Sequence, residues 1–100
     1  MKVTVGEYDT EHQTYDEKSF ASRQLHIHPD YDDINYINDL CLIGISSEIK
    51  FSRYVSKACL PDSTAVEPGT ECYIAGWGTV DYDVPRYPQI MKETGLYFEH

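Results

Sequence analysis

The residue of this sequence best placed to do chemistry is Asp39, which stands directly before the apolar run Leu40–Ile43, with Ile45 beyond Gly44. Apolar residues at successive positions are typical of a strand buried on both faces. A carboxylate at the start of a buried strand is costly unless a hydrogen bond satisfies it. Two roles would satisfy it: the side chain caps the turn before the strand, or it is held rigid to orient a histidine.

Histidines and cysteines give weaker chemical signals. His26 and His28 have a His-x-His spacing that suits a metal, but surface histidines of a strand show the same pattern. The cysteines Cys41, Cys59 and Cys72 include no Cys-x-x-Cys pair, so zinc and redox sites are not indicated. In an exported protein, an odd number of cysteines implies a free thiol or disulfide partners outside this sequence.

Composition limits the class of protein. The 100 residues allow one domain at most, and a net charge of −9 argues against a nucleic-acid partner because nothing would neutralise phosphates. No run of about 18 apolar residues exists, so no membrane span is expected. Met1 leads directly into a strand pattern, so the leader of an exported parent is expected to lie outside this sequence.

Short alternating or apolar runs between turn residues predict an all-β chain, a barrel or a sandwich. Pro29 and Pro61 each end such a run, since proline cannot donate to a strand ladder. Residues 30–38 form a polar loop that bears tyrosines. The expected strands or extended segments are 2–5, 20–28, 40–45, 49–51, 55–60, 71–75 and 89–97.

Several segments together resemble the trypsin-like serine endopeptidases, which have the chymotrypsin fold. Each segment alone is weak, but five in the family's order and near its spacing make a specific match that runs to about Glu93. The matching segments are Val5-Gly6-Glu7-Tyr8-Asp9, Ile27-His28-Pro29-Asp30-Tyr31-Asp32, Asn38-Asp39-Leu40-Cys41-Leu42-Ile43, Ala58-Cys59-Leu60-Pro61 and Gly69-Thr70-Glu71-Cys72-Tyr73-Ile74-Ala75-Gly76-Trp77-Gly78.

The resemblance implies that residues 1–100 are part of a two-barrel protease domain: the later strands of the first barrel and the start of the second. It implies that Asp39 is the acid of a Ser-His-Asp triad, which fixes the tautomer of a histidine and stabilises the imidazolium. Tyr31 and Tyr36 match positions that line a substrate pocket. The alternative for both is a loop tyrosine that packs for contact area.

In many relatives the loop that matches the acidic segment at Glu7, Asp9 and Glu17 binds calcium, an ion that prefers carboxylate and carbonyl oxygens. Lys18 stands close to where a last acidic ligand is expected, so a merely solvated acidic loop is the alternative. Cys59 and Cys72 match cysteines whose disulfide partners would lie outside this chain. Cys41 departs from the family and is expected to be an inert packing thiol.

The family's histidine and serine segments are absent from this sequence. We therefore expect the chain alone to be inactive, and its parent to be a secreted endopeptidase that acts on polypeptide substrates or binds inhibitors, without nucleic-acid or membrane partners. One alternative is a non-catalytic homologue that acts as a protein-binding module. Another is a small acidic calcium-binding β module. The family requires no cofactor, and calcium binding is left open.

Overall fold

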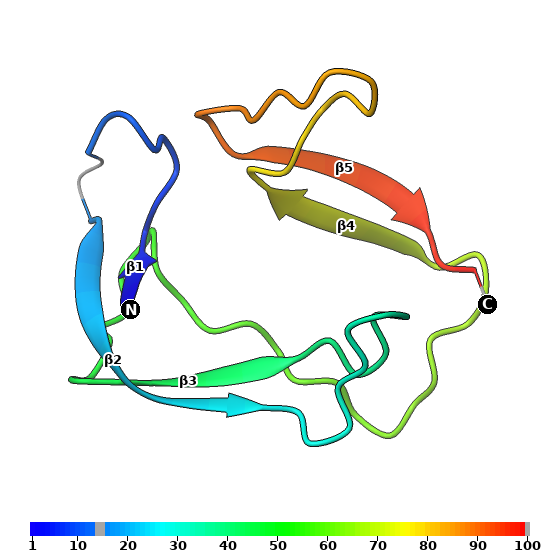
Figure 1. Cartoon of the computed structure of the whole chain (residues 1–100), viewed down its shortest axis with the longest axis horizontal. Helices are drawn as coiled ribbons and strands as arrows, with labels where there is room; N and C mark the ends of the chain where they lie inside the picture. The colour runs from blue at the N-terminus through cyan, green and yellow to red at the C-terminus, as the bar shows by residue number, and fades with distance from the viewer. Residues whose placement is uncertain (14–15, 100) are drawn as a thin grey trace. The chain divides into compact units, whose positions relative to one another are not determined.

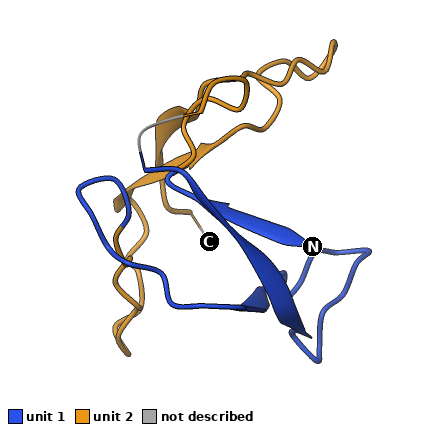
Figure 2. Ribbon diagram, turned by 90° about the vertical axis from the view of Figure 1, so that its left-hand side faces the viewer, with its two compact units in different colours: residues 1–6, 16–55 blue, residues 7–15, 56–100 orange. Residues whose placement is uncertain are grey.

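The structure is a computed structural model that describes residues 1–13 and 16–99, and its regular elements in this part of the chain are five strands without a helix. The predicted all-β class is confirmed. The chain divides into two compact units, which are coloured separately in Figure 2. Unit 1 comprises residues 1–6 and 16–55, and unit 2 comprises residues 7–15 and 56–100.

Unit 1 is a three-stranded antiparallel sheet in the order β1-β2-β3 (Figure 1). Its strands are β1 (Lys2–Val5), β2 (Lys18–Ile27) and β3 (Cys41–Ile45). The long strand β2 pairs with β1 through its first part and with β3 through its second. A register shift between Ser22 and Gln24 interrupts the β2–β3 ladder, and such irregularities bend a strand.

Unit 2 contains an antiparallel pair, β4 (Glu71–Gly76) and β5 (Lys92–Tyr97), which is in register over its whole length. The sequence predicted a longer last strand, 89–97, but β5 begins only at Lys92. The preceding residues pair elsewhere: Asp9 forms a bridge with Ile90, and the Met91 amide donates to the Tyr8 carbonyl at 3.0 Å.

The expected burial of the strand after Asp39 is wrong for this chain. Leu40 is 65% exposed and Leu42 is 67% exposed, and no residue of the described part is fully buried. The physical reason is that each unit supplies one layer of sheet, whereas a core needs a second layer packed against it. Apolar residues on both faces of β3 therefore mark surfaces that unit 1 does not itself cover.

The predicted extended segments 49–51 and 55–60 do not become strands. The chain turns between them, where the Ser52 amide donates to the Val55 carbonyl at 2.8 Å. Both segments lack a ladder partner among the described residues. A strand-like sequence pattern was therefore not enough to place these two segments in a sheet.

Candidate functional site

Asp39 lies at the end of a loop that is closed at its base by the β2–β3 pair. Directly beyond this pair, the His28 amide donates to the Leu40 carbonyl at 3.0 Å. On the other side of Asp39, the Leu40 amide donates to the Asn38 carbonyl at 2.8 Å. Asn38 has a φ of 55°, a left-handed conformation that asparagine tolerates better than most residues. The backbone on both sides of Asp39 is thus fixed.

The interior of this loop is held by side chains. The Asn38 amide group donates to the Asp30 carbonyl at 3.0 Å, and the Asp30 amide donates to Nδ1 of His28 at 3.1 Å. Because a backbone N–H can only donate, Nδ1 of His28 is the acceptor in this hydrogen bond. His28 therefore has a structural role in this loop.

Asp32 binds the loop's own backbone. Its Oδ1 accepts from the amides of Ile34 and Asn35 at 2.9 and 3.2 Å, and its Oδ2 accepts from the Asn35 side chain at 2.8 Å. These hydrogen bonds, the one from the Asn35 side chain first, lower the pKa of Asp32 below its ordinary value of 3.8. Asp32 is therefore a structural carboxylate that stays ionised at neutral pH.

Asp39 contrasts with Asp32 because its carboxylate accepts no hydrogen bond from any residue that the structure describes. It lies on an open hollow of about 280 Å³ within unit 1. Apolar side chains form most of the wall, and the lining residues are Met1, Leu25, Ile27, Tyr31, Asp39, Leu40 and Cys41. A rigid backbone thus presents a carboxylate whose lone pairs are available to a donor from outside this chain.

The two predicted substrate-binding tyrosines differ in placement. Tyr31 lines the same hollow as Asp39 and is 38% exposed. Tyr36 does not line that hollow; it is 70% exposed and has a left-handed φ of 54°. Only Tyr31 is therefore brought together with Asp39 within unit 1.

Cys41 is exposed and lies on the wall of the Asp39 hollow, so its prediction as a packing thiol of a buried strand is wrong. The cause is the same missing second layer that exposes β3. Cys59 is exposed and Cys72 is partly exposed, and all three cysteines are free thiols in this chain.

The acidic segment does not assemble a calcium site among the described residues. In these parts of the chain no group of three or more acidic, histidine or cysteine side chains is placed to hold a metal. The carboxylate of Asp9 accepts from the Glu11 amide at 3.0 Å and lies 3.0 Å from Nδ1 of His12. These contacts, the Glu11 amide first, lower the pKa of Asp9 below 3.8. Calcium binding through Glu7, Asp9 and Glu17 stays a prediction from the sequence.

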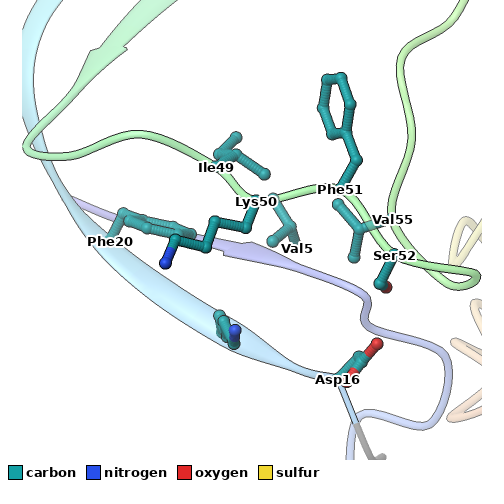
Figure 3. Close-up of a pocket in the computed structure, with 9 residues that line it drawn as sticks. Val5, Asp16, Phe20, Ile49, Lys50, Phe51, Ser52 and Val55 are labelled. Carbon is teal, nitrogen blue, oxygen red and sulfur yellow. The ribbon is translucent and has the colours of Figure 1, made fainter.

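A second hollow in unit 1, of about 80 Å³, contains none of the predicted catalytic or substrate-binding residues. Figure 3 shows apolar side chains of this hollow, including Phe20 and Ile49, with the carboxylate of Asp16 set apart from them. Its lining comes from the ends of β1 and β2 and from the segment between Ile49 and Val55. This hollow is consistent with packing between neighbouring segments.

Sequence reasoning missed the residues that position Asp39. Asn38, His28 and Asp32 fix the loop, whereas the sequence indicated only a polar loop with tyrosines. One signal was available: an aspartate in a polar loop favours an Asx turn, which Asp32 forms by accepting from the Ile34 amide two residues on.

Comparison with known proteins gives a consistent result. A family model described as Trypsin matches residues 1–97. The chain is 34% identical to Trypsin II-P29 of Gallus gallus over 92 residues. This alignment covers 92% of this chain and 37% of that protein. It is 33% identical to Granzyme C of Mus musculus over 97 residues, and this alignment covers 96% of this chain and 39% of that protein.

A solved structure, described as "Structure of GrC", superposes with a TM-score of 0.85 at 30% identity and covers 94% of this chain and 41% of that one. The chain therefore spans well under half the length of the relatives that it matches. None of the described residues belong to a helix long and apolar enough to cross a membrane.

Proposed function

Because this chain belongs to the trypsin family of serine proteases, we propose that it forms part of a secreted endopeptidase in which Asp39 is the triad acid. The observation that carries the proposal is the state of Asp39. Its backbone is fixed on both sides, yet its carboxylate accepts no hydrogen bond from the described residues and lies on an apolar hollow. A carboxylate with these properties suits a donor that a neighbouring part of the protein supplies.

In the proposed reaction, a serine oxygen attacks the carbonyl carbon of a peptide bond and a histidine takes the serine proton. Asp39 accepts the N–H on the other ring nitrogen of that histidine, which keeps the ring in the reactive tautomer and stabilises the imidazolium. Apolar walls such as Leu25 and Ile27 strengthen this hydrogen bond once the hollow is covered, because the local dielectric falls.

The substrate side of the proposal concerns Tyr31. It shares the hollow with Asp39, so an aromatic surface lies beside the acid that orients the base. We propose that Tyr31 contacts the substrate residue just before the scissile one, with Tyr36 at the periphery of the same loop. The chain alone contains neither the nucleophile nor the base, so by itself it is expected to hydrolyse no peptide.

The test is Asp39→Asn in a protein that carries this segment together with the rest of the domain. A triad acid predicts that kcat falls by about 10⁴-fold with little change in KM, because the histidine then adopts the wrong tautomer. Asp33→Asn is the matched control: Asp33 is exposed on the same loop and accepts no hydrogen bond from a described residue. Equal kcat values for the two variants would refute the role of Asp39.

Assays of the unmodified protein distinguish the endopeptidase from the non-catalytic alternative. If it neither turns over peptide substrates nor reacts covalently with a serine-directed phosphonylating reagent, the endopeptidase proposal fails and a binding module remains. Sequence on both sides of this segment gives an independent check, since an active enzyme needs a histidine before Asp39 and a serine after it.

A further inference from the structure

The tripeptide Asp-Tyr-Asp occurs twice in this chain, around Tyr31 and around Tyr82. Both tyrosines therefore have a carboxylate on each side, and local sequence alone does not separate them. The structure distinguishes them by exposure, since Tyr82 is far more exposed than Tyr31. This difference determines which of the two side chains an enzyme can modify more readily.

Tyr82 is fully solvent-exposed, with a relative accessibility of 102%. It lies in the turn that connects β4 to β5, which is closed by a hydrogen bond from the Val80 amide to the Arg86 carbonyl at 3.1 Å (Figure 1). Asp81 fixes the turn, because its Oδ1 accepts from the Asp83 amide at 2.9 Å. The Tyr82 hydroxyl has no hydrogen-bond partner among the described residues.

Tyr31 is held much more tightly. It is 38% exposed, lines the Asp39 hollow, and its amide donates to the His28 carbonyl at 3.1 Å. The next residue, Asp32, donates its amide to Ile37 and uses both carboxylate oxygens within the loop. Tyr31 is therefore less accessible to a modifying enzyme than Tyr82.

We propose that Tyr82 is a site of tyrosine O-sulfation. A transferase that acts on a tyrosine side chain needs an exposed phenol and a segment that enters its substrate cleft. The flanking carboxylates of Asp81 and Asp83 attract a cleft lined by basic residues. Among the two Asp-Tyr-Asp segments, only the one around Tyr82 combines this charge with full exposure.

In the group transfer, the phenol oxygen of Tyr82 forms a bond to the sulfur of an adenylyl sulfate donor. The bond between that sulfur and the donor's phosphate oxygen breaks, and the nucleotide leaves with the electron pair. The phenol proton passes to a basic group of the transferase, so nothing is oxidised or reduced. The product is a permanently charged sulfate ester between Asp81 and Asp83, an anionic segment suited to a basic partner.

The choice of sulfate over phosphate rests on the proposed function, because tyrosine sulfation occurs on exported proteins. The assay is therefore made independent of export and of proteolysis. The folded protein is incubated with a purified tyrosine sulfotransferase and an isotopically labelled adenylyl sulfate donor, and modified peptides are identified by mass spectrometry.

The folded protein is expected to take up label at Tyr82 at least about ten times faster than at Tyr31, because Tyr31 is less exposed and lies in a loop held by its own hydrogen bonds. Tyr82→Phe should remove nearly all of this label and Tyr31→Phe should leave it unchanged. Both substitutions remove only a hydroxyl group, and Tyr82 makes no contact that the fold needs. After denaturation, both Asp-Tyr-Asp segments should be labelled at similar rates.

The proposal is overturned if the folded protein takes up no label, if Tyr31 is labelled as fast as Tyr82, or if the denatured chain keeps the same preference. It is also overturned if the protein isolated from its own cells carries a phosphatase-sensitive group on Tyr82. Asp39→Asn should be sulfated normally, so failure of the endopeptidase proposal would not by itself overturn the sulfation proposal.

Discussion

At the scale of single residues, two aspartates of one loop have opposite states. Asp32 has its carboxylate oxygens filled by three hydrogen bonds from Ile34 and Asn35, whereas Asp39 accepts none from the described residues. A carboxylate that already accepts several bonds gains little from a further donor, while one that accepts none gains a full charge-assisted bond. Asp32 therefore stabilises the loop, whereas the carboxylate of Asp39 is available to a donor from outside this chain.

Asp32 allows a pH prediction at this scale. Its pKa is lowered from 3.8 in the folded loop, so its stabilising effect is complete above about pH 4 and is lost as the pH falls through the lowered value. Asp32→Ala should make the amide hydrogens of Ile34 and Asn35 exchange about tenfold faster at neutral pH, since their acceptor is gone.

The control for this prediction is Asp33→Ala, which removes a carboxylate that binds no described residue and should leave both exchange rates unchanged. Titration of the Asp32 carboxyl carbon by NMR checks the pKa directly. A midpoint at or above 3.8 would contradict the hydrogen-bond explanation.

At the scale of elements, the end of β1 depends on Gly6. Gly6 has a φ of 72°, and a Cβ atom there would lie 2.7 Å from the Asp16 carbonyl oxygen and 3.2 Å from Cγ2 of Val55. Gly69 also has a positive φ, 86°, but a Cβ there would meet nothing within 4 Å. The two glycines thus share a backbone requirement and differ in steric surroundings.

We expect Gly6→Ala to lower the free energy of unfolding by about 3 kcal/mol and Gly69→Ala by about 1 kcal/mol. The backbone conformation is strained by Cβ at both positions, but only at Gly6 must a neighbouring carbonyl also move. Denaturant unfolding of a protein that carries this segment measures both values. Equal losses would show that the close approach of Asp16 does not matter.

At the scale of the whole molecule, each unit exposes apolar side chains that a compact domain would cover. Leu42 is 67% exposed on β3, which is an edge strand of unit 1, and Ile74 is 58% exposed on β4 of unit 2. Exposed apolar strands with an unpaired edge favour association. The chain also spans well under half the length of its relatives.

The prediction at this scale is that the chain of 100 residues, prepared alone, self-associates and binds an apolar dye such as ANS. Sedimentation velocity over a range of concentrations measures the association. Leu42→Lys places a charge on the exposed strand and should shift the distribution toward monomer, whereas Lys50→Arg, an exposed change without loss of charge, should not. A monomer without dye binding would contradict this account.

The sequence by itself determined the all-β class, the family and the loop that carries Asp39. These features depend on alternating residues, on proline and glycine at turns and on short family segments, and all of them are local. Only the tertiary structure decided that β3 is exposed, that Asp39 is without a partner while Asp32 is not, and that Tyr82 is exposed while Tyr31 is held. Burial and hydrogen bonding depend on which segments meet in space, and residue order does not specify what covers a given face.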